Sequence, residues 1–94
     1  MGVTKHDRIA KYIAQKKDTV YHSNKGVDIR TSTQAIEVEV DAGKLKEGVR
    51  QLQGTSKARY LAVPNEIVGE AIKYTQRTGV GVMNEHGKIR KRAN

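Results

Sequence analysis

The pattern of apolar and polar residues predicts a helix followed by short strands in the first half of the chain. Apolar positions recur with helical spacing over residues 5–16, and Thr4, followed by an acid three residues later, forms a capping box at the start of that helix. Residues 19–22 are β-branched and aromatic, and a turn-forming segment separates them from Val27-Asp28-Ile29, which predicts a hairpin. Residues 35–40 alternate strictly and predict the clearest strand of the sequence.

The second half alternates helices with buried strands. Apolar residues at i, i+4 and i+7 predict a short amphipathic helix over 45–54. Residues 60–63 form a continuous apolar run that stops at a proline, which is typical of a strand in a parallel sheet. A capped apolar stripe predicts a helix over 65–79, and residues 80–83 predict a further strand.

The predicted order of elements is α-β-β-β-α-β-α-β, which indicates an α/β fold. An antiparallel meander followed by strand-helix crossovers implies a mixed central sheet flanked by helices. We expect one domain over residues 1–87, since 94 residues suffice for a single core. Residues 88–94 form a basic C-terminal tail, interpreted as a mobile electrostatic arm.

Charge and composition narrow the function. The formal net charge of +8 favours a polyanionic partner, and DNA is the partner we expect. The chain has no cysteine, which fits a reducing cytoplasm and excludes thiol nucleophiles and cysteine-based metal centres. No apolar run is long enough for a signal peptide or a membrane span, so a cytoplasmic location without membrane contact is expected. Because so small a chain buries limited surface, a homodimer is also expected.

Against the basic background, residues 28–41 carry a local charge of −3. Glu37 and Glu39 lie two apart on a predicted strand and share a face, which Asp28 on the neighbouring strand can also reach. Such a set would suit a hard divalent cation such as Mg²⁺ or Mn²⁺. The alternative is that the two glutamates belong to the solvated face of an amphipathic strand. The three histidines are too dispersed for a metal site, and the four tyrosines are expected in core packing.

These segments resemble the core of the PD-(D/E)XK nuclease superfamily, with archaeal Holliday-junction resolvases and VRR-Nuc-type domains as look-alikes. The resemblance covers roughly residues 4 to 84. It rests on four segments in order, namely Gly26-Val27-Asp28-Ile29, Ala35-Ile36-Glu37-Val38-Glu39-Val40, Gln51-Leu52 and Tyr60-Leu61-Ala62-Val63-Pro64. It implies a restriction-endonuclease-like αβββαβα core.

Carried over by position, the resemblance implies that Asp28 and Glu37 bind the metal. Glu39 stands where the family usually has a catalytic lysine, and is similar to the third acidic group of a few restriction enzymes. Gln51 matches a glutamine that lies beside the site in related nucleases, and Asp7 is a weak counterpart of the family's first-helix glutamate.

The implied activity is metal-dependent hydrolysis of DNA phosphodiester bonds, with branched or junction DNA as a candidate substrate. Phosphate contacts are expected from basic residues that flank the acids, namely Lys25, Arg30, Lys44, Lys46 and Arg50. Two alternatives stay open: a non-catalytic DNA-binding module that retains the nuclease fold, and a protein-protein adaptor. No dinucleotide fingerprint, P-loop or serine-hydrolase elbow is found, so no small-molecule organic cofactor is expected.

Overall fold

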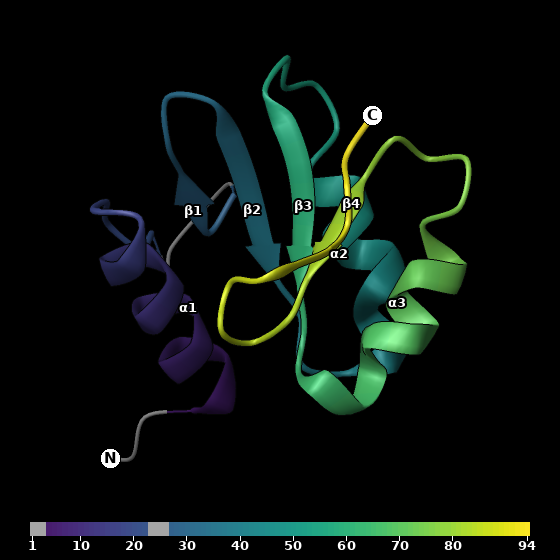
Figure 1. The fold of residues 1–94 in the computed structure, drawn as a ribbon, viewed down its shortest axis with the longest axis horizontal. Coiled ribbons are helices and arrows are strands. Elements are labelled where there is room, and N and C mark those ends of the chain that lie inside the picture. Colours follow the sequence, from purple (N-terminus) through teal and green to yellow (C-terminus); the bar gives the residue numbers. More distant parts are fainter. Residues whose placement is uncertain (1–3, 23–26) are drawn as a thin grey trace.

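The computed structural model describes residues 4–22 and 27–94. Within them the chain forms three α-helices and a five-stranded mixed sheet (Figure 1). The elements run in the order α1 (Lys5–Lys16), β1 (Ile29–Arg30), β2 (Gln34–Val38), α2 (Leu45–Gln51), β3 (Ala58–Ala62), α3 (Val68–Tyr74), β4 (Gly81–Met83) and β5 (Ile89–Lys91), with 3-10 turns η1 (Ala42–Lys44) and η2 (Asn65–Ile67) leading into α2 and α3.

The sheet keeps the strands in sequence order, β1-β2-β3-β4-β5. Its two outer pairs, β1–β2 and β4–β5, are antiparallel, whereas β2, β3 and β4 run parallel to one another. Helices α2 and α3 make the two crossovers that parallel neighbours require. The carboxyl ends of the three central strands therefore lie at one edge of the sheet, where ligands commonly bind in α/β folds.

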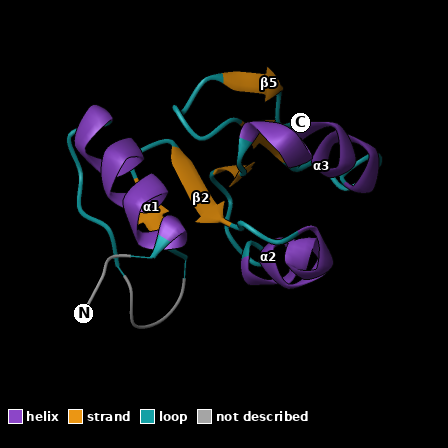
Figure 2. Cartoon of the chain, turned by 90° about the horizontal axis from the view of Figure 1, so that it is seen from below, coloured by secondary structure: helices purple, strands orange, loops and turns teal. Residues whose placement is uncertain are grey.

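The helices form a layer on each side of the sheet. Helix α1 covers one face, and α2 with α3 covers the other, as the end-on view shows (Figure 2). Two apolar clusters fill the spaces between the layers: one joins α1 to Ile29, Ile36 and Val38, and the other joins α2 and α3 to Leu61 and Val82. Alternate residues of each strand thus enter different cores, as the pleat requires.

Several elements match the predictions from the sequence. Helix α1 has the predicted bounds, and the Thr4 side chain accepts a hydrogen bond from the Asp7 amide, as expected of an N-cap. The buried run at residues 60–63 lies in or directly after β3, which is parallel to both of its neighbours. The α/β class with a mixed sheet is confirmed.

Two predictions need correction. Of the strand expected over 19–22, only Tyr21 pairs, in an isolated antiparallel bridge with Ile29; the turn expected before residue 27 lies outside the described residues. The prediction of a mobile basic arm after residue 87 is wrong, because Ile89–Lys91 forms strand β5, which pairs with β4. Ile89 also packs against the α1-side core. No helix within residues 4–22 and 27–94 combines the length and apolar character needed to cross a bilayer.

Candidate active site

The three predicted carboxylates lie together near the carboxyl end of β2. Ile36 and Val38 enter the α1-side core, so Glu37 and Glu39 face α2. Register pairs Ile29 with Ile36, which sets the preceding residue, Asp28, beside Glu37, and the Asp28 amide donates a 3.2 Å hydrogen bond to Glu37 Oε1. The relative exposures are 7% for Asp28, 7% for Glu37 and 9% for Glu39. We call these three residues the carboxylate cluster; they are not the solvated strand face of the alternative interpretation.

Glu39 is next to α2 at the position of Gly48. A β-carbon added to Gly48 would lie 2.7 Å from Glu39 Cγ and 2.6 Å from Leu61 Cδ2. Because real β-carbons do not approach other heavy atoms so closely, only glycine lets α2 come this near to β2 and β3. The close approach buries the stem of Glu39.

Asp28 is anchored by two donors. Its Oδ2 accepts a 2.9 Å hydrogen bond from the Val38 amide and lies 3.1 Å from His6 Nε2. The Val38 contact ties the carboxylate to the backbone of β2, and the His6 contact links it to the first turn of α1. Asp28 is therefore held in place by the sheet and by the helix on the opposite face.

His6 belongs to a chain of hydrogen bonds that the sequence analysis missed. The Tyr21 hydroxyl donates to Asp7 Oδ1 at 2.7 Å and lies 3.2 Å from His6 Nδ1. Because its one proton goes to Asp7, the Tyr21 oxygen can only accept from His6, so Nδ1 carries a proton. His6 Nε2 faces a carboxylate, so that both ring nitrogens act as donors, as in imidazolium. The pKa of His6 is raised, chiefly by its hydrogen bond to Asp28.

Burial raises the pKa of both glutamates. Desolvation, followed by repulsion from Asp28, raises the pKa of Glu37 to about 8. Desolvation likewise raises the pKa of Glu39 to about 7, against the opposing charges of His6 and Lys44. Strongly perturbed carboxyl groups gathered at one edge of a sheet are typical of functional sites.

The donor set fits Mg²⁺ or Mn²⁺ in its chemistry, because these hard cations prefer carboxylate oxygens. In the part of the chain that the structure describes, however, no three His, Asp or Glu side chains are arranged so that they could hold a metal ion. One oxygen of Asp28 is engaged by His6 and Val38, and one oxygen of Glu37 by the Asp28 amide. Side-chain rotation would be needed to bring three oxygens to one point.

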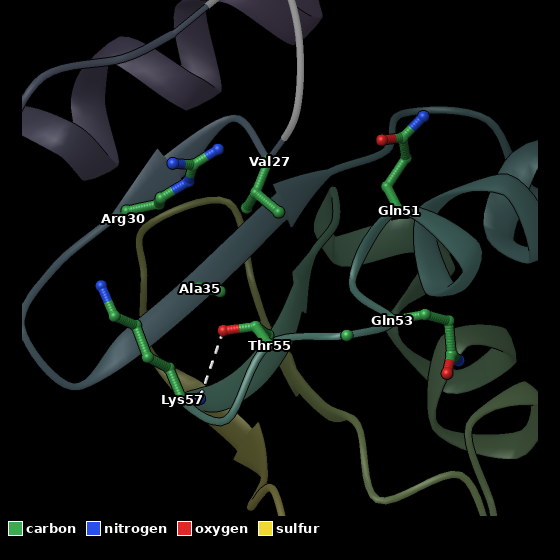
Figure 3. A pocket seen from close by; sticks show the side chains of 8 residues that line it. Val27, Arg30, Ala35, Gln51, Gln53, Thr55 and Lys57 are labelled. Atoms are coloured by element: carbon green, nitrogen blue, oxygen red, sulfur yellow. Dashed lines mark hydrogen bonds between the residues drawn. The ribbon is translucent and has the colours of Figure 1, made fainter.

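The predicted phosphate-binding residues fall into two groups. Lys44, Lys46 and Arg50 line a hollow beside η1 and α2, in which Arg50 is ion-paired with Glu47. Arg30 instead lines a second hollow, at the carboxyl end of α2, together with Gln51 (Figure 3). Lys25 lies outside the described residues.

Gln51 is not hydrogen-bonded to the carboxylate cluster. It ends α2 and lines the second hollow, which also contains Lys57 and Thr55, two residues that the sequence analysis did not select. Asp7 also stays apart from the cluster and reaches it only through Tyr21 and His6.

A scan against protein-family models, a search of curated proteins and a search of solved structures each find no match.

Proposed function

We propose that this chain is a metal-dependent DNA endonuclease with a restriction-endonuclease-like core. The observation that carries the proposal is the carboxylate cluster: three acids from adjacent strands, each under 10% exposed, at the edge of the sheet where parallel strands end. Burying carboxylates weakens a fold unless they are paired or bind a cation, so such a cluster favours a function. The observed order, α-β-β-α-β-α-β-β, has one strand fewer before α2 than the αβββαβα core that the resemblance implies, because Tyr21 contributes an isolated bridge in place of a strand.

The roles follow from the surroundings of each acid. Asp28, Glu37 and Glu39 would hold Mg²⁺ or Mn²⁺, which when bound makes water a better nucleophile and neutralises charge on the scissile phosphate. In the protein without a bound cation the pKa of Glu39 is about 7. A cation held beside it would lower that pKa, and Glu39 would then act as a charged carboxylate that orients the water. His6 is a positioning residue, since it fixes Asp28 and offsets the charge of the cluster.

Basic residues on both sides of α2 suit the binding of a DNA strand. Lys44 is close enough to Glu39 to lower its pKa, and Lys46 lines the same hollow. Such residues position phosphates without reading the base sequence. Branched or junction DNA remains the proposed substrate class, and a homodimer would allow paired cuts in the two strands.

Cleavage assays test the proposal. Duplex, single-stranded and four-way-junction DNA are incubated with the protein and Mg²⁺ or Mn²⁺. Glu37→Ala should reduce cleavage by about a hundredfold or more, because a metal ligand contributes several kcal/mol to the transition state. Glu70→Ala, at an exposed position of α3, is the matched control and should cleave normally. Cleavage that persists in Glu37→Ala would reject the nuclease assignment.

A non-catalytic DNA-binding module is the second candidate. Two observations favour it: Glu39 stands where the resemblance places a lysine, and the described residues contain no ready three-ligand set. Calorimetric titration with Mn²⁺ separates the two candidates. A nuclease should take up Mn²⁺ and lose that uptake in Asp28→Asn, whereas a binding module should retain DNA without divalent ions and cleave no substrate.

A further inference from the structure

The second hollow lies next to the carboxylate cluster on the same face of the sheet. It has a volume of about 410 Å³ and is lined by Val27, Arg30, Ala35, Gln51, Gln53, Gly54, Thr55 and Lys57. Arg30 pairs directly with Ala35 in the β1–β2 ladder, and residues directly opposite each other share a face. Asp28 and Glu37 stand two residues further along these segments, about 7 Å away. The hollow therefore adjoins the cluster.

The second hollow and the carboxylate cluster carry opposite charges. The hollow contains two cations, Arg30 and Lys57, and no acid among its lining residues. Within residues 4–22 and 27–94, neither cation forms an ion pair. A polyanion that reaches the carboxylate cluster would thus find two free positive charges beside it.

Lys57 is held in a fixed place. Its Nζ donates a 2.7 Å hydrogen bond to the Thr31 carbonyl, and its amide donates to Thr55 Oγ1 at 3.2 Å. The side chain is half-buried, so its ammonium group is ordered before any ligand arrives. An ordered cation binds a phosphate with a smaller entropy loss than a mobile surface lysine.

The other polar groups suit the rest of a nucleotide. Figure 3 shows Arg30 and Lys57 on one side of the hollow and Gln51 across from them; Thr55 lies beside Lys57, whose amide donates to the Thr55 hydroxyl. An amide and a hydroxyl both donate and accept, as recognition of a sugar or a base edge requires. The volume lies in the range of small-molecule sites.

We propose that this hollow is a nucleotide subsite, which binds the DNA nucleotide adjacent to the bond that the carboxylate cluster would cut. Arg30 and Lys57 hold its phosphate, and Gln51 and Thr55 contact the attached nucleoside. The inference rests on the proposed function and adds to it the position of the neighbouring nucleotide.

Binding measured in EDTA tests the subsite without depending on cleavage. Fluorescence anisotropy of a labelled single-stranded octanucleotide gives Kd for wild type, Arg30→Gln and Lys57→Gln, with Arg8→Gln and Lys73→Gln as exposed controls on α1 and α3. Each subsite variant should weaken binding by roughly fivefold to tenfold and lower the salt slope by about 0.7. The controls should change neither quantity. Subsite variants that behave like the controls would overturn the proposal.

A second measurement covers the case in which Lys57→Gln fails to fold. Wild-type protein labelled with ¹⁵N is titrated with 2′-deoxyadenosine 5′-monophosphate and followed by NMR. The amide signals of Gln51, Thr55 and Lys57 should shift in a saturable way, and a buffer of inorganic phosphate should shift Lys57 but not Gln51. Shifts elsewhere in the molecule, or no shifts, would overturn the subsite.

The failures of the two proposals are distinguishable. If Glu37→Ala abolishes cleavage while Arg30→Gln and Lys57→Gln bind DNA normally, the subsite proposal is rejected and the nuclease assignment is supported. If the subsite variants lose affinity but no divalent ion supports cleavage, the nuclease assignment is rejected, and the hollow is retained as a nucleotide-binding site of a DNA-binding module.

Discussion

This domain buries polar side chains in two regions, and the hydrogen bonds that these side chains make with the protein differ greatly between the regions. Asn84 Oδ1 accepts hydrogen bonds from the amides of His86 and Lys88 at 2.9 and 3.0 Å, and Thr75 Oγ1 donates to the Ala71 carbonyl at 2.8 Å. In the carboxylate cluster, Glu37 accepts one 3.2 Å hydrogen bond, and no donor from the described residues reaches Glu39. Neutral oxygens and hydroxyls that bond to the backbone stabilise the fold, whereas desolvated acids with few protein donors weaken it and indicate a function.

The largest expected effect on stability is at Asn84. Its side chain closes the turn between β4 and β5, so Asn84→Ala leaves two amides without their acceptor. We expect a loss of about 2–3 kcal/mol in the free energy of unfolding. Urea denaturation at pH 7 measures it, and Asn84→Asp, which keeps an acceptor oxygen, should lose less. A loss below about 1 kcal/mol in the alanine variant would remove the contrast between the two regions.

Glu37→Gln should raise the free energy of unfolding, whereas Asn84→Ala should lower it. The pKa of Glu37 is about 8 in the fold against an ordinary 4.5, so between these values the folded state keeps a proton that the unfolded state releases. Its contribution to stability is complete below the ordinary pKa and is lost as pH rises to about 8. In EDTA, Glu37→Gln should therefore stabilise the protein by about 2 kcal/mol at pH 8.5, and hardly at all at pH 4.

Urea denaturation at both pH values checks this result, with Glu70→Gln at an exposed position of α3 as the control. The control should have the same small effect at each pH. An equal effect of Glu37→Gln at pH 4 and pH 8.5 would mean that burial of this carboxylate does not weaken the fold.

Gly48→Ala is expected to cost about 1–2 kcal/mol, even though alanine normally stabilises a helix relative to glycine. The new β-carbon would push against Leu61 and Glu39. Gly69 is the matched control: it lies in α3, and a β-carbon there meets nothing within 4 Å. Gly69→Ala should therefore stabilise the protein by up to about 1 kcal/mol. Thermal unfolding compares the two; stabilisation by both variants would show that α2 is free to move away from Glu39.

The sequence was informative wherever a local period determined the outcome. Strict alternation over 35–40 is enough to put Glu37 and Glu39 on one face, and Thr4 is enough to start α1 at the right residue. Asp28 lies beside Glu37 because the strand that follows Asp28, β1, pairs antiparallel with β2. These predictions use contacts within about ten residues.

Longer-range contacts were out of reach. His6 meets Asp28 across 22 positions, and Lys57 meets Thr31 across 26, so no spacing in the sequence reveals either pair. Strand β5 was missed because Ile89 is its one apolar residue among basic neighbours, and its pairing with β4 depends on the turn that Asn84 closes. Tyr21 packs against the α1-side core as expected, and its hydroxyl also takes part in the network around His6, which the sequence did not indicate.

Tyr21→Phe gives the smallest effect and tests how far the fold supports the carboxylate cluster. The change removes the hydroxyl that donates to Asp7 and accepts from His6, while the ring is kept. We expect Tm to fall by roughly 3 °C at pH 7, as for one modest hydrogen bond in a domain of this size.

The Tyr21 hydrogen bond is the main cause of the lowered pKa of Asp7, so the loss of Tm should shrink as pH falls through that pKa and the carboxylate becomes protonated. Tyr12→Phe, on α1 and 47% exposed, is the control and should leave Tm unchanged. Since His6 keeps its contact with Asp28, Mn²⁺ affinity should change by less than about twofold; a larger change would extend the functional region from the carboxylates through His6 to Tyr21, and would place Tyr21 with the acids rather than with Asn84.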